Sequence, residues 1–153
     1  ALGEGRGERI TPLPSFTPLW VVLFRPPVSV PPSKTQRLYA LLTPSHYTEG
    51  QFTKRTVDLI RQEGNVCRTS IFNVFEEVAF TAFPGLKRYW QLFYDLGADN
   101  IHLAGSGPTL FTLVGDRSKG NEIYQCLRKE GLEAYLVQTK AKHRRRFGVG
   151  LPS

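Results

Sequence analysis

The segment of this sequence best suited to hold a ligand is a glycine-rich run between two apolar stretches. It reads Gly105-Ser106-Gly107-Pro108-Thr109 and follows residues 101–104, while residues 109–114 continue the second stretch. Glycine adopts backbone conformations that other residues avoid, so two glycines around a serine allow a tight turn whose N–H groups converge on a ligand. Spacing alone leaves two interpretations open, a phosphate- or substrate-binding turn and a plain hairpin turn.

Other residues that could do chemistry are absent or scattered. Phosphoryl transfer requires a phosphate-binding loop, a balancing cation and a group that positions the hydroxyl. The sequence has no Walker-type Gly-x-x-x-x-Gly-Lys-Ser/Thr motif. Its histidines and its cysteines, Cys67 and Cys126, match no metal-ligand spacing and no Ser-His-Asp arrangement, so we expect no metal site. His102 directly precedes the glycine-rich run, and we interpret it as a partly buried structural histidine rather than a phosphate ligand.

The elements that must position the run follow from the spacing of apolar residues. We predict strands at 19–25, 100–104, 109–114 and 133–138, and helices at 34–42, 51–62, 70–82, 86–96 and 119–129. Ser33 is a candidate cap for the first helix. We expect residues 1–18 to be an irregular or extended lead-in, 19–139 to be one domain, and 140–153 to be a basic tail. The order predicts an α+β fold, a ferredoxin-like sandwich in which helices cover one face of a four-stranded antiparallel sheet.

Composition limits the class of protein. With 153 residues and 41% hydrophobic content, the chain can bury one compact core. The net charge of +7 is concentrated in residues 140–146, which is more typical of a solvated tail than of a nucleic-acid reader. No apolar run approaches the roughly 20 residues that span a bilayer, and we find no signal peptide. Together with two cysteines expected to be reduced, this favours a cytoplasmic protein without a membrane partner. Because the chain contains no methionine, we expect an excised piece of a longer protein or removal of the initiator.

Four segments in order carry a resemblance to a known family. They are Gly5-Arg6-Gly7-Glu8-Arg9-Ile10-Thr11-Pro12, the apolar run ending in Pro26-Pro27-Val28-Ser29-Val30, Asn73-Val74-Phe75-Glu76, and the glycine-rich run. In this combination the chain resembles, up to about Gln138, the C-terminal half of the 4-diphosphocytidyl-2-C-methyl-D-erythritol kinases, which belong to the GHMP kinase superfamily. One departure is Val74, where the family has an aspartate.

The resemblance implies an activity that this chain would share only as part of a longer protein. The family moves the γ-phosphate of ATP, with Mg²⁺, onto the 2-hydroxyl of its cytidine diphosphate substrate, a step of non-mevalonate isoprenoid precursor biosynthesis. Its nucleotide loop, its catalytic aspartate and the lysine partner lie in the N-terminal half, and no position here matches them. We therefore expect no catalytic residue in this chain, which alone would be inactive. ATP and Mg²⁺ would be bound mainly by the missing N-terminal half.

The resemblance also implies which residues lie near the substrate. Gly105, Ser106, Gly107 and Thr109 match a loop that helps shape the phosphate and acceptor site. Val28, Ser29, Thr35 and Tyr39 match the region that approaches the cytidine. Family members often stack an aromatic residue on the base; the aligned position here falls near Thr35 and Gln36, and Tyr39 is the nearest aromatic.

Two alternatives stay open at this stage. The first is a different GHMP kinase, such as a homoserine or mevalonate kinase, although the segment from Gly5 to Pro14 argues against it. The second is a non-enzymatic ferredoxin-like domain that binds a small ligand or RNA, for which the basic tail gives weak support.

Overall fold

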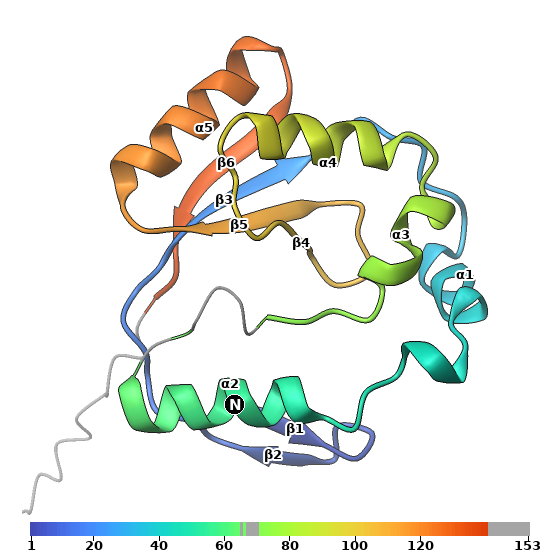
Figure 1. Cartoon of the computed structure of the whole chain (residues 1–153), viewed down its shortest axis with the longest axis vertical. Helices are drawn as coiled ribbons and strands as arrows, with labels where there is room; N and C mark the ends of the chain where they lie inside the picture. The colour runs from blue at the N-terminus through green and yellow to red at the C-terminus, as the bar shows by residue number, and fades with distance from the viewer. Residues whose placement is uncertain (65, 67–70, 141–153) are drawn as a thin grey trace, which may run out of the picture.

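A computed structural model describes residues 1–64, 66 and 71–140 of the chain. Figure 1 shows a sheet covered by helices, with one helix and a small hairpin lying apart from it. The elements in chain order are β1 (Leu2–Glu4), β2 (Arg9–Thr11), β3 (Trp20–Arg25), α1 (Lys34–Leu41), the 3₁₀ helix η1 (Pro44–His46), α2 (Gln51–Glu63), α3 (Glu76–Ala82), α4 (Leu86–Asp95), β4 (His102–Leu103), β5 (Leu110–Val114), α5 (Arg117–Lys129) and β6 (Glu133–Gln138).

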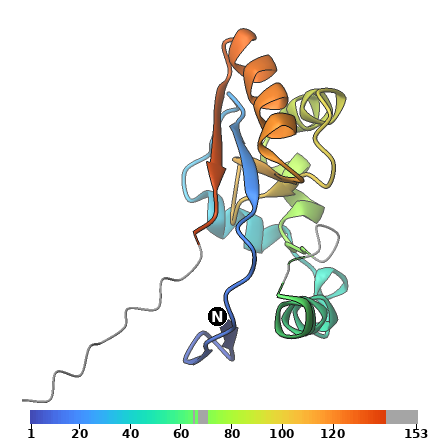
Figure 2. The same ribbon diagram turned by 90° about the vertical axis from the view of Figure 1, so that its left-hand side faces the viewer.

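The main sheet has four antiparallel strands, as the sequence predicts, and the structure places them in the order β4-β5-β3-β6. β3 is the long central strand: Val22 lies opposite Thr112 of β5 on one side and Leu136 of β6 on the other. β4 lies at the edge and pairs with β5 at only two positions. Helices α4 and α5 lie on the same face of the sheet (Figure 2). The predicted ferredoxin-like α+β architecture is confirmed.

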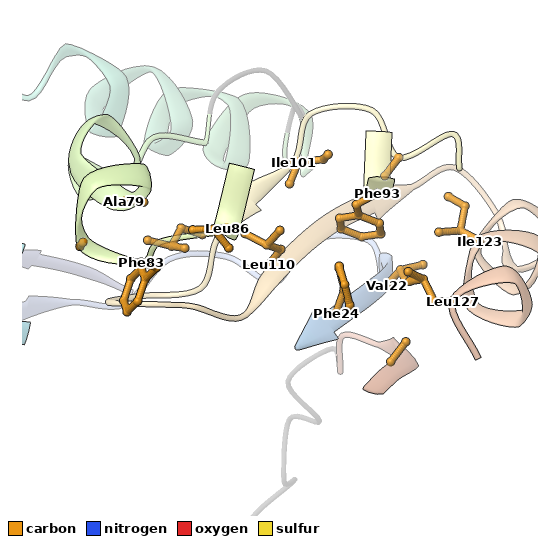
Figure 3. Close-up of a cluster of buried hydrophobic side chains, with 14 of the residues drawn as sticks. Val22, Phe24, Ala79, Phe83, Leu86, Phe93, Ile101, Leu110, Ile123 and Leu127 are labelled. Atoms are coloured by element: carbon orange, nitrogen blue, oxygen red, sulfur yellow. The ribbon is translucent and has the colours of Figure 1, made fainter. Parts of the chain in front are cut away.

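The core lies between the sheet and these helices (Figure 3). Side chains of a strand alternate between faces, so Val22 and Phe24 of β3 point to the helices, where both are fully buried. The ring of Phe24 meets that of Phe93 from α4 edge to face, with centroids 5.5 Å apart. Ile123 and Leu127 of α5 complete the layer. This packing gives the strands around the glycine-rich run a rigid support.

Helix α3 begins later than the periodicity predicts, which corrects the expected helix over 70–82. Residues 71–75 are not helical, and 67–70 lie outside the described residues. The side-chain Oδ1 of Asn73 accepts a hydrogen bond from the Phe75 N–H at 3.1 Å, which turns the chain before the helix can start. Helix α3 therefore starts at Glu76.

Two smaller expectations also need correction. Ser33 precedes α1 in a left-handed conformation with φ 53° and makes no side-chain capping bond, because capping needs an extended backbone that directs the hydroxyl at the next amides. The lead-in over 1–18 is not wholly irregular, since β1 and β2 pair in it as an antiparallel hairpin. Glu8 accepts a hydrogen bond from the Arg6 N–H within this hairpin.

Helix α2 lies beside the hairpin, away from the sheet (Figures 1 and 2). A hollow separates the two, lined by Leu2 and Gly3 of the hairpin and by Phe52, Val57 and Ile60 of the helix. The helix ends at Glu63 and is followed by Gly64, whose left-handed φ of 60° stops it. In the described part of the chain, no helix is long and apolar enough to cross a membrane.

Candidate functional site

The glycine turn, residues 105–109, connects β4 to β5 and is closed by backbone hydrogen bonds. The Ala104 N–H donates to the Thr109 carbonyl at 2.8 Å, and the Gly107 N–H donates to the Ala104 carbonyl at 2.9 Å. Gly105 and Gly107 both adopt left-handed conformations, with φ 56° and 63°. The turn thus needs glycine at both positions, as the sequence predicts.

The two glycines differ in what surrounds them. A Cβ added at Gly107 would lie 2.6 Å from Cδ1 of Leu103, a contact too close for any side chain to be accepted without movement. A Cβ added at Gly105 would meet no atom within 4 Å. The turn is therefore packed against β4 at Gly107 and accessible from outside at Gly105.

The start of helix α1 holds one side of the glycine turn. The Lys34 ammonium donates a hydrogen bond to the Gly107 carbonyl. The Thr35 hydroxyl donates to Oγ of Ser106 at 3.0 Å. Both bonds join residues more than 70 positions apart in the sequence. Thr35 and Ser106, two residues that the family resemblance places near the substrate, thus come together, whereas Lys34 was not anticipated from the sequence.

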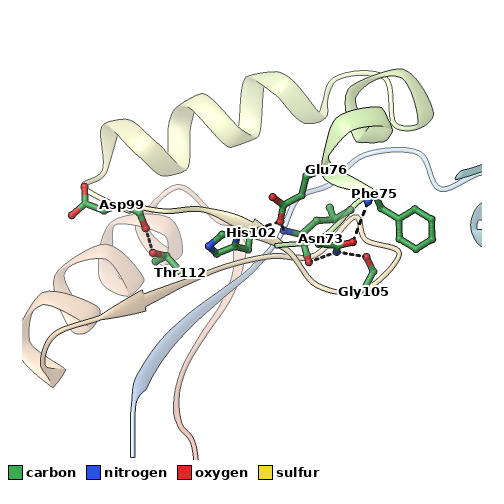
Figure 4. Close-up of polar contacts among 8 residues, drawn as sticks. Asn73, Phe75, Glu76, Asp99, His102, Gly105 and Thr112 are labelled. Carbon is green, nitrogen blue, oxygen red and sulfur yellow. Dashed lines mark hydrogen bonds and ion pairs between the residues drawn. The ribbon is translucent and has the colours of Figure 1, made fainter. Parts of the chain in front are cut away.

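The segment before α3 and its first residue hold the other side (Figure 4). The Asn73 side-chain amide Nδ2 donates to the carbonyls of Leu103, at 2.9 Å, and Gly105, at 2.8 Å. Oε1 of Glu76 accepts from the Leu103 N–H at 2.8 Å and lies 3.2 Å from Nδ1 of His102. His102 is buried, with 8% of its surface exposed, in agreement with its interpretation as a structural residue. Asn73 thus ties the turn to the segment that precedes α3, and the role of Glu76 was not anticipated from the sequence.

The proline-rich turn after β3 shares a hollow with the glycine turn. Pro26, Pro27 and Val28 line this hollow of about 390 Å³ together with Pro108. Val28 also packs against the core, and its N–H donates to the Pro26 carbonyl at 2.9 Å. Ser29 is exposed but does not line the hollow. Val28 and Ser29 were both predicted to lie near the substrate. The structure brings Val28 to the glycine turn, whereas Ser29 lies at the surface outside the shared hollow.

Tyr39 lies one helical turn after Thr35 on α1 and is 57% exposed, so it is not a core residue. Its ring meets the ring of Phe75 edge to face, with centroids 5.0 Å apart. Phe75 also donates its N–H to Asn73, which holds Gly105. The exposed ring of Tyr39 therefore packs on Phe75, which is hydrogen-bonded to the same Asn73 that holds the glycine turn.

No cluster of three or more His, Cys, Asp or Glu side chains suited to a metal ion occurs in the described ranges. Cys126 is a free thiol, while Cys67 lies outside those ranges. The predicted basic tail lies outside them too, apart from Lys140. In the described part of the chain, the glycine turn is surrounded by backbone amides, the hydroxyls of Thr35 and Ser106 and the Lys34 ammonium group, which suit an anionic ligand, while the Glu76 carboxylate is occupied by Leu103 and His102.

Comparison with known protein sequences gives a consistent result. The family model for the C-terminal domain of GHMP kinases matches residues 50–133. A 4-diphosphocytidyl-2-C-methyl-D-erythritol kinase of Dehalococcoides mccartyi is 45% identical over 139 residues, which cover 91% of this chain and 49% of that protein. The kinase of the same name from Geobacillus kaustophilus is 37% identical over 129 residues, 84% of this chain and 43% of its own. The chain spans about half the length of these curated relatives.

Two solved structures of GHMP-type kinases resemble this chain. A crystal structure of a 4-(cytidine 5'-diphospho)-2C-methyl-D-erythritol kinase superposes with a TM-score of 0.67 at 25% identity, covering 88% of this chain and 47% of that one. A homoserine kinase from Cytophaga hutchinsonii shares the fold, with a TM-score of 0.57 at 17% identity, covering 86% and 44%. Because the family model covers more than half of its residues, this chain belongs to the GHMP kinase family and corresponds to its C-terminal domain.

Proposed function

We propose that this chain is the C-terminal, substrate-binding part of a kinase that transfers the γ-phosphate of ATP to the 2-hydroxyl of 4-diphosphocytidyl-2-C-methyl-D-erythritol. The observation that carries the proposal is the anchored glycine turn in a chain 45% identical over 139 residues to kinases of this name. The step would belong to non-mevalonate isoprenoid precursor biosynthesis. We assign it to the cytoplasm, as expected from the sequence.

In this proposal the glycine turn binds and orients an anionic part of the substrate or nucleotide. Backbone N–H groups of a turn held in one conformation need no reorganisation when charge develops on a transferring phosphoryl group. Lys34 contributes a positive charge at the edge of the turn, where its ammonium donates to the Gly107 carbonyl. ATP and Mg²⁺ would be held mainly by an N-terminal half of the kind that the relatives possess. The chain alone would then bind but not catalyse.

The cytidine would lie on the α1 side of the turn. Val28, Ser29, Thr35 and Tyr39 are the residues that we assign to this side. Tyr39 presents an exposed ring next to Phe75 and can stack on a base. Stacking of a base on an aromatic side chain contributes about 1–3 kcal/mol, which corresponds to roughly a 5- to 150-fold change in affinity.

A chimera tests the proposal directly. The N-terminal half of the Dehalococcoides mccartyi kinase would be joined to Ala1, because the aligned C-terminal half of that protein is 45% identical to this chain. We expect the chimera to phosphorylate 4-diphosphocytidyl-2-C-methyl-D-erythritol in the presence of ATP, and the 153-residue chain alone to leave it unchanged. Mass spectrometry detects the phosphorylated product. A chimera that unfolds cooperatively and binds ATP, yet leaves this substrate unchanged, would contradict the proposal.

The Tyr39→Ala variant tests the cytidine side within the same assay. We expect the KM for the cytidine substrate to rise by roughly 5- to 150-fold while the KM for ATP stays within about 3-fold. Tyr94→Ala is a matched control, since Tyr94 lies on α4 and is exposed to 58%, compared with 57% for Tyr39. If Tyr39→Ala and Tyr94→Ala change the KM for the cytidine substrate equally, Tyr39 does not contact the cytidine.

A further inference from the structure

Among the residues that the structure describes, no strand pairs with the outer side of the edge strand β4. In the described sheet β4 pairs with β5 alone, and over only two residue pairs. Ala104 hydrogen-bonds to Thr109 of the β5 side, so in an antiparallel ladder the N–H and C=O of the preceding residue, Leu103, point outward. Leu103 is 1% exposed, and buried backbone groups require partners. Something other than a strand must supply them.

Asn73 and Glu76 supply these partners with their side chains (Figure 4). The Leu103 carbonyl accepts from Asn73 at 2.9 Å, and the Leu103 N–H donates to Glu76 at 2.8 Å. Asn73 then reaches one step further and donates to the Gly105 carbonyl at 2.8 Å, inside the glycine turn. The two side chains thus act in the place of a neighbouring strand and extend that role into the turn.

The hydrogen-bond inventory of these side chains argues for a positioning role rather than ligand contact. Both Asn73 bonds to β4 and the turn start from Nδ2, which has two donor hydrogens, and Oδ1 accepts from Phe75 at 3.1 Å. The amide orientation follows from this pattern, since only the oxygen can accept from an N–H. In Glu76, Oε1 serves both Leu103 and His102, and the side chain is only 23% exposed. Asn73 has no donor left for a ligand.

We propose that Asn73 and Glu76 are positioning residues that fix the glycine turn relative to helix α3, so that its backbone N–H groups meet the phosphate-bearing ligand in one geometry. This inference rests on the proposed function for its ligand, but the anchoring itself does not. Displacing a binding loop by about 1 Å can lower a reaction rate by roughly 10²-fold, so a small loosening of the turn would be visible in catalysis.

The first experiment measures the turn itself in the 153-residue chain. Amide hydrogen exchange, read by ¹⁵N NMR, would follow Ala104 and Gly107, whose N–H groups form the backbone hydrogen bonds that close the turn, beside Val22 and Thr112 of the central ladder. In Asn73→Asp the new carboxylate still accepts from the Phe75 N–H, but it cannot donate to the carbonyls of Leu103 and Gly105. We expect exchange in the turn to accelerate at least ~10-fold while the central ladder changes less than ~3-fold.

Glu76 is tested with a rescue and a matched control. Glu76→Ala is expected to accelerate exchange in the turn like Asn73→Asp. Glu76→Gln keeps an oxygen that accepts from Leu103 and should stay within ~3-fold of the parent chain. Glu77→Ala is the control, because Glu77 is the next residue of the same helix and is exposed. Unchanged exchange in the turn, or equal acceleration in turn and central ladder, would overturn the positioning role.

The second experiment places the same variants in the chimera. We expect Asn73→Asp and Glu76→Ala to lower kcat at least ~10-fold with the KM for ATP within ~3-fold, and Glu76→Gln to restore most of kcat. A loosened turn with unchanged kcat would overturn the inference. A parent chimera that is folded but inactive would instead contradict the proposed function. The exchange experiment alone would then show whether Asn73 and Glu76 hold the glycine turn.

Discussion

The contact between Gly107 and Leu103 gives a quantitative prediction about the glycine turn. Alanine at either Gly105 or Gly107 must adopt a left-handed conformation, which costs about 1–2 kcal/mol in an L-residue. At Gly105 this is the whole cost, because a Cβ there meets no atom within 4 Å. At Gly107 the Cβ would lie 2.6 Å from Cδ1 of Leu103, which is almost completely buried. Overpacking of this kind adds about 1–3 kcal/mol.

We therefore expect Gly105→Ala to lower the free energy of unfolding by about 1–2 kcal/mol and Gly107→Ala by about 2–5 kcal/mol. Urea titrations followed by circular dichroism measure both, provided that the slope with denaturant stays constant. A double-mutant cycle with Leu103→Ala isolates the contact, because that change removes the atoms with which the new Cβ collides. In the Leu103→Ala background, Gly107→Ala should cost only about 1–2 kcal/mol, a coupling of about 1–3 kcal/mol.

Two results would refute this reasoning. The first is an equal loss of stability in Gly105→Ala and Gly107→Ala, which would mean that Leu103 yields to the new methyl group without cost. The second is simple additivity of the changes at positions 103 and 107. In either case the packing of Gly107 against β4 would not explain why the turn has glycine there.

Three further predictions concern the scaffold. Thr112→Val should lower the free energy of unfolding by about 1–3 kcal/mol, because Thr112 is fully buried and its hydroxyl donates to the Asp99 carbonyl, which would lose its partner; Thr112→Ser, which keeps the hydroxyl, is the comparison in urea titrations. Asp116→Ala should cost about 1 kcal/mol, since Asp116 caps α5 by accepting from the Lys119 N–H at 2.9 Å, whereas Asp116→Asn should cost much less. The pKa of Tyr135 is raised because its hydroxyl donates to the Glu133 carboxylate, whose negative charge also opposes ionisation. Folding thus favours the neutral phenol: this stabilisation is complete below the ordinary tyrosine pKa and is lost as pH rises through the raised pKa. Ultraviolet titration of tyrosinate should show the pKa of Tyr135 falling toward its ordinary value in Glu133→Gln, with Tyr135→Phe identifying the signal.

Much of the scaffold could be predicted because its signals are local. The apolar run of β3 ends at two prolines, and helices α2, α4 and α5 each combine an apolar face with a glycine after the last turn. The glycine turn was predicted for the same reason, since Gly105 and Gly107 bracket a short polar segment between apolar stretches. These features depend on residues a few positions apart, and propensity and periodicity describe such separations well.

The anchoring of the turn could not be predicted, because its bonds join distant positions. Lys34 and Gly107 are 73 residues apart, and Asn73 and Gly105 are 32 apart. The spacing of Asn73 and Glu76 did carry a signal, but an ambiguous one. An asparagine followed three residues later by a glutamate is typical of a capping box, in which the glutamate would turn back to the helix start. Here Glu76 binds β4 instead, and the same spacing serves a tertiary contact.

The different surroundings of the two glycines also predict that stability and function separate at this turn. Gly107 is packed against Leu103, and its carbonyl accepts from Lys34, so a ligand has little access to it. Gly105 has open space where a Cβ would project, and its carbonyl is held by Asn73. A phosphate-bearing ligand would therefore approach at Gly105 and Ser106. In the chimera, Gly105→Ala should lower kcat/KM at least ~10-fold despite its small effect on stability, because the methyl group would occupy the ligand's space. If Gly105→Ala keeps full kcat/KM, the open side of the turn is not where the ligand binds.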